Sequence, residues 1–396
     1  MSKERSAAIV GVYEYPLRVA RGVSAMEIKV DSIRAALEDA GLAWSDVDAL
    51  YDAQDGEAGG GLQLGAYLGM KPTVIDTTLV GGSSFEFQAA HAMRDIAAGK
   101  CNVAVLSYGA VSASNRIAIG TGDRGGDAPN WRNNMERMYG STLIANYGLV
   151  KQRHMFEYGT TTEKLAGISI ATRKHAMRNP DAVKAMTDLE FVGVNEITAQ
   201  DVLDSRVVAD PLHLLECCMI SDGGGAVIIA SPEVARNCRK PPVWIIGTGE
   251  AIKYQENGGD ITTSAAAQSG PIAFGEAGVT PSDIDIGMIY DSFSITVAVC
   301  LEDLGFCAKG EAADFVADGS LAFDNSAQKL ALNTDGGGLS SNHPGMRGIF
   351  LLFEAARQLR GESTSQVPDA RLAVAHGNGG MLGAVHTGGT IILAKD

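Results

Sequence analysis

Positive charge, metal-type cysteine spacings and long apolar stretches are all scarce in this sequence. Its 32 Lys and Arg are outnumbered by 47 Asp and Glu, and the net charge is −15. Phosphate contacts need Lys and Arg, so this balance argues against a general nucleic-acid binder and against docking on anionic membranes. No apolar run approaches the roughly 18 residues of a membrane span, and residues 1–15 lack the apolar core of a signal peptide. We therefore expect a soluble, cytoplasmic protein.

Signals for metal and nucleotide binding are missing as well. The six cysteines show no CxxC pair and no spacing typical of zinc, which favours free thiols in a reducing compartment. The neighbours Cys217 and Cys218 flank an apolar run and are interpreted as core residues. No GxxxxGKS/T loop occurs, and the glycine-rich stretch 120–126 lacks the strand–turn–helix context of a nucleotide site. We predict no metal site, because metal-ligand spacing is also missing around five histidines: His91, His154, His175, His213 and His386.

What the chain does contain is an internal repeat. The stretch "AALEDAGLAWSDVDALYD" (35–52) resembles "IAFGEAGVTPSDIDIGMIYD" (272–291), and each is preceded by a short apolar strand. Uninterrupted apolar strands such as "VAVLSYG" are typical of sheets that helices cover on both faces. We therefore predict two similar α/β halves, 1–240 and 241–396, packed around a shared core. An insertion in the first half, about 112–215, is expected to form a lid or a substrate-binding surface.

The repeat relates Ser83 to His343, because each residue lies where a loop leads into a long helix. In the first half the junction reads "LVGGSSFEF", and in the second half it reads "SSNHPG". The start of a helix offers free N–H donors and the positive end of its dipole, which stabilise an oxyanion or an anionic nucleophile. If a pseudo-twofold axis relates the halves, both helix starts face one pocket. The duplication thus predicts a site shared between the halves.

Four motifs together resemble the thiolase superfamily, closest to its sterol-carrier-protein branch, over nearly the whole chain. They are "SSNHPG" (340–345), "HGNGGMLGA" (376–384), "YDSF" (290–293) and "SRVVADPLHLLECCMISDGGGAVIIAS" (205–231). The resemblance implies a thiolase fold of two duplicated βαβαβαββ halves in α-β-α-β-α layers, with a loop-domain insertion. It also implies an acyl-CoA thioester as substrate, with coenzyme A carried by the substrate and no tightly bound cofactor.

The site residues that the resemblance implies depart from the thiolase pattern. Ser83 stands at the nucleophilic cysteine, His376 at the second cysteine, and Tyr290 at the Asn or His of the third motif. The family's histidine base is retained as His343. These four residues are the predicted catalytic set. Further residues are expected to line the substrate or the oxyanion site: Ser84, Asp291, Asn342, Gly379 and Gly380.

Without the thiols, the retained histidine favours a reaction that needs no covalent intermediate. A β-hydroxyacyl-CoA can break its Cα–Cβ bond by retro-aldol chemistry, given a proton acceptor, an oxyanion site and a proton donor to the carbanion. Steroid side-chain aldolases of this branch share the tyrosine of "YDSF" but carry a tyrosine near the position of His343. We predict retro-aldol cleavage with His343 as general base. Two alternatives stay open: a thiolytic acyltransferase with Ser83 as nucleophile, and an inactive scaffold that binds acyl-CoA or lipid.

The resemblance further implies an assembly. Family members are dimers or tetramers, and members of this branch often work with a small OB-fold, zinc-ribbon protein. We therefore expect a homodimer or a larger assembly, and a partner of that kind. Basic residues of the insertion are candidates for contacts to the phosphates of coenzyme A: Arg132, Arg137, Lys151, Arg153, Arg173 and Lys174. The sequence leaves the acyl group and the reaction direction open.

Overall fold

The computed structural model describes residues 5–53, 60–116, 142–191, 193–254, 259–317, 319, 321–324, 330–382 and 385–396. In this part of the chain, one large sheet has the strand order β10-β9-β11-β12-β8-β1-β7-β4-β2-β3. Its strands are β1 (Ala8–Glu14), β2 (Ala49–Asp52), β3 (Val74–Asp76), β4 (Val103–Val111), β7 (Asp222–Ala230), β8 (Val243–Tyr254), β9 (Ile286–Ile289), β10 (Ala331–Leu332), β11 (Leu372–Gly380) and β12 (Val385–Ala394).

The same five-strand pattern occurs twice in this sheet. The order β3-β2-β4-β7-β1 in the first part of the chain is matched by β10-β9-β11-β12-β8 in the second. In both patterns the first three strands run parallel, and the last two join them by antiparallel pairing. A short pairing of β1 with β8, through Ala8–Trp244 and Ile9–Val243, connects the two patterns. The predicted α/β architecture with two duplicated halves is confirmed.

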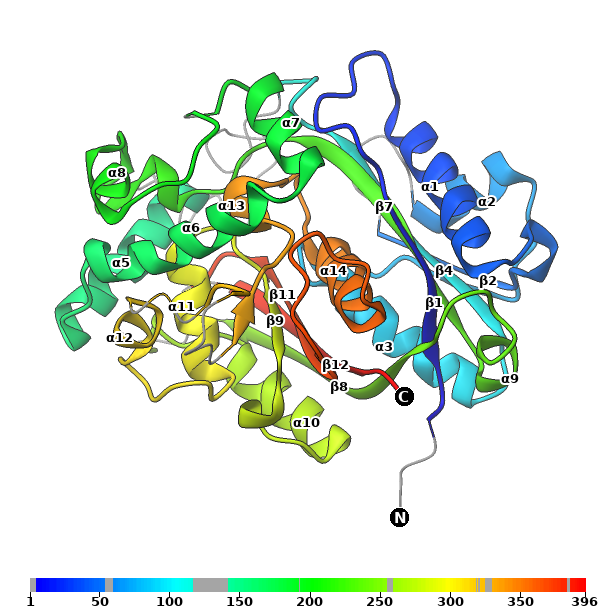
Figure 1. Ribbon diagram of the computed structural model, residues 1–396. Coiled ribbons are helices and arrows are strands. Elements are labelled where there is room, and N and C mark those ends of the chain that lie inside the picture. Colours follow the sequence, from blue (N-terminus) through cyan, green and yellow to red (C-terminus); the bar gives the residue numbers. More distant parts are fainter. Residues whose placement is uncertain are drawn as a thin grey trace, which may run out of the picture.

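Helices form three layers around the two five-strand units (Figure 1). The middle layer holds α3 (Ser84–Ala97) and α14 (Gly348–Arg360), which contact strands of both units. The outer face of the first unit is covered by α1 (Ala25–Ala40) and α2 (Gly60–Leu68). The outer face of the second is covered by α10 (Ala266–Ala277) and α11 (Ser294–Asp303). The expected α-β-α-β-α layering is therefore present, and the middle helices begin where the two units meet.

Local sequence explains where the covering helices begin and end. Ser24 and Glu27 form a capping box at the start of α1, in which each side chain accepts a hydrogen bond from the other's backbone N–H. Gly41, Gly278 and Gly361 end α1, α10 and α14 in the left-handed conformation, which a residue without Cβ adopts at little cost. The apolar strand β4 is buried along almost its whole length, as a strand between two helical layers must be.

The insertion of the first half packs on the second half. Its helices α5 (Leu143–Tyr158) and α6 (Thr162–Ala176) contact α11, and α6 also contacts α12 (Ala312–Ala317) and α13 (Gly337–Ser340).

The remaining elements are α7 (Pro180–Asp188), α8 (Ala199–Asp204), β5 (Val207–Ala209), β6 (Leu212–His213), α9 (Pro232–Ala235) and the short 3-10 helices η1 (Trp44–Asp46), η4 (Leu214–Glu216) and η5 (Pro281–Asp283). The glycine-rich stretch 120–126, which was not expected to bind a nucleotide, lies outside the described residues.

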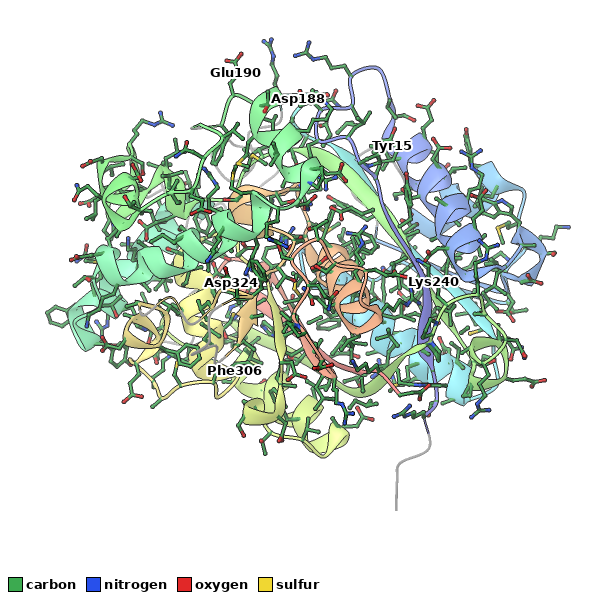
Figure 2. The ribbon with its side chains drawn as sticks, viewed as in Figure 1. Tyr15, Asp188, Glu190, Lys240, Phe306 and Asp324 are labelled. Carbon is green, nitrogen blue, oxygen red and sulfur yellow. The ribbon has the colours of Figure 1, made fainter. Side chains whose placement is uncertain are left out.

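We propose that the division between the halves falls near residue 240, in the turn before β8. Support comes from Lys240, labelled in Figure 2, whose ammonium group lies 2.5 Å from Asp39 and 2.9 Å from Glu362. Asp39 belongs to α1 of the first half, and Glu362 follows α14 of the second. The turn residue thus ties both halves together at the point where the repeat restarts.

One buried ion pair fixes the insertion to the core. Lys151 of α5 donates to Glu216 (2.6 and 2.7 Å), Thr162 Oγ1 (2.8 Å) and the Pro211 carbonyl (2.9 Å). Glu216 also accepts from Ser294 Oγ at the start of α11 (2.8 Å). Both charged side chains are fully buried, so removing one partner leaves the other charge unpaired in a dry environment.

The change Lys151→Met is therefore expected to lower the free energy of unfolding by about 3–5 kcal/mol, measured by urea denaturation. The control is Lys174→Met, which removes an exposed pair with Asp324 (2.8 Å) and should cost less than about 1 kcal/mol. Equal effects of the two changes would contradict the assigned role of the Lys151–Glu216 pair.

Candidate active site

Tyr290 and His343 form the centre of the site. Tyr290 continues the face of β9 that packs on the middle helices, and its phenol oxygen lies 3.0 Å from His343 Nε2. The backbone N–H of Arg347 donates to the same phenol oxygen (3.2 Å). The two rings meet edge to face, with centroids 5.5 Å apart and planes at 88°. The phenol donates to His343 Nε2 when the proton of the neutral ring is on Nδ1.

Burial keeps both groups of this pair neutral. Desolvation, with a smaller contribution from the Arg347 guanidinium, lowers the pKa of His343 to about 4. Desolvation also raises the pKa of Tyr290 well above its usual value. At neutral pH the site therefore holds an unprotonated imidazole next to a protonated phenol. His343 Nδ1 is buried and makes no hydrogen bond to another described residue.

The backbone of His343 is fixed by the connection between the halves. Its N–H donates to Ser221 Oγ (3.0 Å), and its carbonyl accepts from the Ser221 N–H (3.3 Å). The following Pro344 carbonyl accepts from Ser112 Oγ (2.7 Å), and Tyr108 OH accepts from the Met346 N–H (3.0 Å). The loop that carries the imidazole is thus held from the first half of the chain.

The Arg347 guanidinium organises the residues behind the pair. It donates to Asp291 (3.1 Å), to both oxygens of Asp335 (2.8 and 2.7 Å) and to Asn342 Oδ1 (2.8 Å). Asp291 in turn accepts from the backbone N–H groups of Gly338 (2.8 Å) and the next residue (3.2 Å). Burial raises the pKa of Asp291 to about 6, and the Arg347 charge opposes that rise. Asp291 and Asn342, predicted to line the substrate, lie in this network behind Tyr290.

Ser83 is the N-cap of α3, and the glycine before it packs on Tyr290. A methyl group placed on the preceding Gly82 would lie 2.3 Å from Cε2 of Tyr290, so the ring packs on the backbone that enters α3. The Gly348 N–H donates to the Gly82 carbonyl (3.1 Å) and brings the start of α14 to the same place. The structure therefore brings the segment that carries Ser83 and the start of α14 next to Tyr290, which binds His343.

The Ser83 hydroxyl itself points to a threonine. Its Oγ lies 2.6 Å from Thr387 Oγ1, which donates to the Val80 carbonyl (2.7 Å). The neighbouring Ser84 hydroxyl donates to the Gly81 carbonyl (2.6 Å) and accepts from the Val80 N–H (3.0 Å). Within the described ranges, no imidazole forms a hydrogen bond with the Ser83 hydroxyl. A serine nucleophile would need such a base.

His376 lies on the opposite face of the sheet. Its Nδ1 is 2.9 Å from Thr390 Oγ1, and its ring lies next to Gly388. Side chains alternate along β11, so the positions on either side of His376 face the middle helices instead. Gly379 is on that inner face, where an added methyl would lie 3.0 Å from Ser83 Oγ, and Gly380 packs beside Gly81. Burial lowers the pKa of His376 to about 3, and the structure does not bring this residue to the Tyr290–His343 pair.

Sequence reasoning missed several residues of this region. Arg347 stands four residues after His343, where a basic residue at a helix start is a weak signal. Glu86, in the first turn of α3, is fully buried although most buried charges are paired. Cys218, interpreted as a core residue, is partly exposed, and its thiol is close enough to Tyr290 to influence the pKa of the phenol.

The basic residues suggested for coenzyme A occupy varied positions. Lys151 and Arg173 are buried, and Arg173 donates to Ser340 Oγ (2.9 Å). Arg153 is paired with Glu157, and Lys174 with Asp324, which is labelled in Figure 2. Two further candidates, Arg132 and Arg137, lie outside the described residues. The described part of the chain contains no group of three metal-ligating side chains, and no described helix has the length and apolarity of a membrane crossing.

Comparison with known proteins identifies the family to which this chain belongs. Residues 247–395 match the family described as thiolase C-terminal domain-like. A steroid side-chain-cleaving aldolase of Thermomonospora curvata is 32% identical over an alignment that covers 92% of this chain and 93% of that protein. An acetyl-CoA acetyltransferase of Methanothermobacter thermautotrophicus is 30% identical over 98% of both chains.

A solved structure named Ltp2-ChsH2(DUF35) aldolase has the same fold. It superposes with a TM-score of 0.86 at 30% identity and covers 99% of this chain and 98% of that chain. The resemblance inferred from the four motifs is confirmed. The chain belongs to the thiolase superfamily, in the branch that includes steroid side-chain-cleaving aldolases.

Proposed function

We propose that this enzyme cleaves the Cα–Cβ bond of a β-hydroxyacyl-CoA thioester by retro-aldol chemistry. The observation that carries the proposal is the hydrogen bond between Tyr290 and His343. The two cysteine positions of the thiolase pattern are occupied by Ser83 and His376, so neither provides a thiol. A relative with the same overall sequence is named a steroid side-chain-cleaving aldolase, which supports this choice of reaction. Coenzyme A enters as part of the substrate, and no tightly bound cofactor takes part.

The pair acts as a proton relay. The β-hydroxyl gives its proton to the Tyr290 oxygen while the phenol proton moves to His343 Nε2. The raised pKa of the phenol disfavours a lasting phenolate, so the two transfers are coupled, and the Arg347 N–H stabilises the charge that develops on the oxygen. The carbonyl then forms at Cβ, the Cα–Cβ bond breaks, and its electrons pass to the thioester as an enolate. The start of α3, with Ser83, Ser84 and the facing Gly379–Gly380, provides the positive dipole end for that oxyanion.

Two alternative functions have less support from the geometry of the site. Thiolysis through Ser83 requires a base for its hydroxyl, and Thr387 occupies that place. An inactive scaffold does not account for a phenol and an imidazole that are both buried and oriented toward each other. We also propose a cytoplasmic homodimer or larger assembly. The partner proposed is a small OB-fold, zinc-ribbon protein, because the aldolase of similar structure is named together with a DUF35 component.

Wild-type protein, alone and with such a partner, is expected to cleave β-hydroxyacyl-CoA thioesters to an aldehyde or ketone and a shorter acyl-CoA without free coenzyme A. A panel that varies the acyl chain, followed by chromatography of the products, identifies the reaction. Cleavage of β-ketoacyl-CoA that depends on free coenzyme A would instead establish thiolysis.

The change Tyr290→Phe keeps the ring that packs on Gly82 and removes the hydroxyl that relays the proton. We expect kcat/KM to fall by about 10²–10⁴-fold. The matched control is Tyr51→Phe, at the repeat-related position in β2, whose hydroxyl donates to Asp95 (2.7 Å) away from the site. That variant should keep kcat/KM within about threefold of wild type, and full activity of Tyr290→Phe would exclude the relay.

Ser83→Ala distinguishes the retro-aldol route from thiolysis through a covalent acyl-enzyme. Because the retro-aldol route forms no acyl-enzyme, the variant should keep kcat/KM within about tenfold of wild type. Loss of activity by about 10³-fold or more would show that the serine is a nucleophile. Trapping of an acyl-enzyme by mass spectrometry after rapid quenching provides an independent measurement.

The pH dependence of kcat/KM follows from the pKa of His343. The imidazole is competent as a base when it is unprotonated, and its pKa is lowered to about 4. Below that value the base is protonated and the rate falls, whereas between pH 5.5 and 7 it should be constant. A titration with a midpoint near about 6.5, the ordinary histidine value, would show that His343 is not the buried base of the reaction.

A further inference from the structure

One requirement of retro-aldol chemistry is still unfilled: an acid that protonates the α-carbon of the enolate. His376, a sequence-level candidate, lies on the far face of the sheet. An unused titratable group on the inner face is Glu86, at the third position of α3. Its side chain is fully buried, and neither carboxyl oxygen has a hydrogen-bond partner among the described residues. Burial of an unpaired polar group is costly, so its retention requires an explanation.

Glycines make the space that this carboxyl occupies. A methyl group added to Gly377 would lie 2.1 Å from Glu86 Oε2, and one added to Gly348 would lie 2.5 Å from the same oxygen. On β12, a methyl on Gly389 would lie 2.6 Å from Glu86 Cβ. Glycine weakens a strand interior and a helix start, yet any side chain at these positions would displace the carboxyl. The notch between β11, β12 and the start of α14 is therefore shaped to hold the carboxyl group.

The notch adjoins the site already described. The same added methyl on Gly377 would lie 2.8 Å from the Cα of Ser83. Gly377 is also the strand neighbour of Tyr290, since the Tyr290 N–H donates to the His376 carbonyl (2.9 Å) in the parallel pairing of β9 with β11. Gly348 follows Arg347, whose N–H holds the phenol. The carboxyl thus lies at the junction of both helix starts and the Tyr290 strand.

Among the described residues, no charged side chain contributes to the pKa of this carboxyl. The elements around it present Gly348 on α14, Gly377 on β11 and Gly389 on β12, none of which titrates. The guanidinium of Arg347, the residue before Gly348, is bonded to Asp291 and Asp335. Burial raises the pKa of Glu86 to about 8, and only the polar backbone of Glu86 itself opposes that rise. The group is a neutral acid at neutral pH and has a proton to give.

We propose that Glu86 is the proton donor that converts the enolate into the acyl-CoA product, an assignment that rests on the proposed retro-aldol function. When the Cα–Cβ bond breaks, its electron pair passes through the enolate to Cα and takes the Glu86 proton. Glu86 is left as a carboxylate, and His343 holds the proton from the β-hydroxyl. Transfer of that proton to Glu86 through solvent during product release restores both groups. One proton has then moved from the substrate oxygen to the substrate carbon.

The test uses the reverse of this step in deuterated water. The full-length protein is incubated with propionyl-CoA and with acetyl-CoA, and α-deuteration is followed by mass spectrometry. Wild type is expected to exchange the α-hydrogens, and Glu86→Gln, which has the same shape but no acidic proton, should exchange at least about 100-fold more slowly. Glu86→Asp should recover part of the rate, because it restores the acid at a shorter reach.

Glu354→Gln is the matched control. Glu354 is a buried acid of α14 whose pKa is also raised, to about 7, but it accepts hydrogen bonds from Thr334 (2.6 Å) and Ser363 (2.5 Å) away from the site. Its variant should exchange at the wild-type rate. Exchange by Glu86→Gln at the wild-type rate would overturn the assignment, whether or not the enzyme cleaves β-hydroxyacyl-CoA. If the exchange depends on Glu86 but the protein cleaves no β-hydroxyacyl-CoA, the proposed reaction is refuted, whereas the assignment of Glu86 as proton donor to the α-carbon stands.

Infrared difference spectroscopy provides a measurement that does not depend on activity. Wild type minus Glu86→Gln at pH 6 should show the carbonyl stretch of a protonated carboxyl group, and that band should disappear when the pH is raised to 10. A missing band at pH 6 would overturn the proposal, because an ionised Glu86 has no proton to donate. A protein that shows neither exchange nor cleavage would overturn both proposals.

Discussion

The contact on which the site depends is the buried guanidinium of Arg347. It binds two carboxylates and an amide oxygen, and its own backbone N–H reaches the phenol of Tyr290. One residue therefore determines the position of the loop before α14, the strand end after β9 and the orientation of the reacting hydroxyl. A single charge in a dry interior is costly unless it is fully paired, and full pairing requires that all these segments keep one arrangement.

Duplication supplies the second constraint. Two copies of one α/β unit pack so that the helices α3 and α14 lie side by side and begin at the same place (Figure 1). Such close contact between the helix starts and the strand ends is possible because the backbone carries no side chain at the contact points. Gly82 lies against the Tyr290 ring, and Gly377 lies against Ser83 and Glu86. Glycine in these positions is a requirement of packing and brings the polar groups together.

The chemistry of the site follows from its dryness. A thiolase divides a difficult reaction into two easier steps by forming a covalent intermediate on a thiolate. This chain keeps the thiolase fold, but Ser83 stands where the nucleophilic cysteine would be. The three groups proposed to transfer protons are instead neutral at working pH, because burial lowers the pKa of His343 and raises those of Tyr290 and Glu86. Neutral acids and bases are able to exchange protons without leaving a charge that the interior cannot solvate. Cleavage of a carbon–carbon bond through an enolate requires that kind of exchange.

The sequence by itself determined the duplicated α/β architecture, because apolar strands, helix-ending glycines and the repeated Tyr-Asp stretch are local patterns. It also related Ser83 to His343, since the repeat makes their positions equivalent at two helix starts, whereas Tyr290 was expected from the family resemblance. It did not determine the role of His376, because neighbouring residues of a strand point to opposite faces and a shift of one residue exchanges them. Pairing of β11 with β9 and packing against α3 place Gly377 on the inner face and His376 on the outer one. Arg347 and Glu86 were beyond the reach of sequence patterns for the same reason: their surroundings are built from strands and helices that are far apart in the chain.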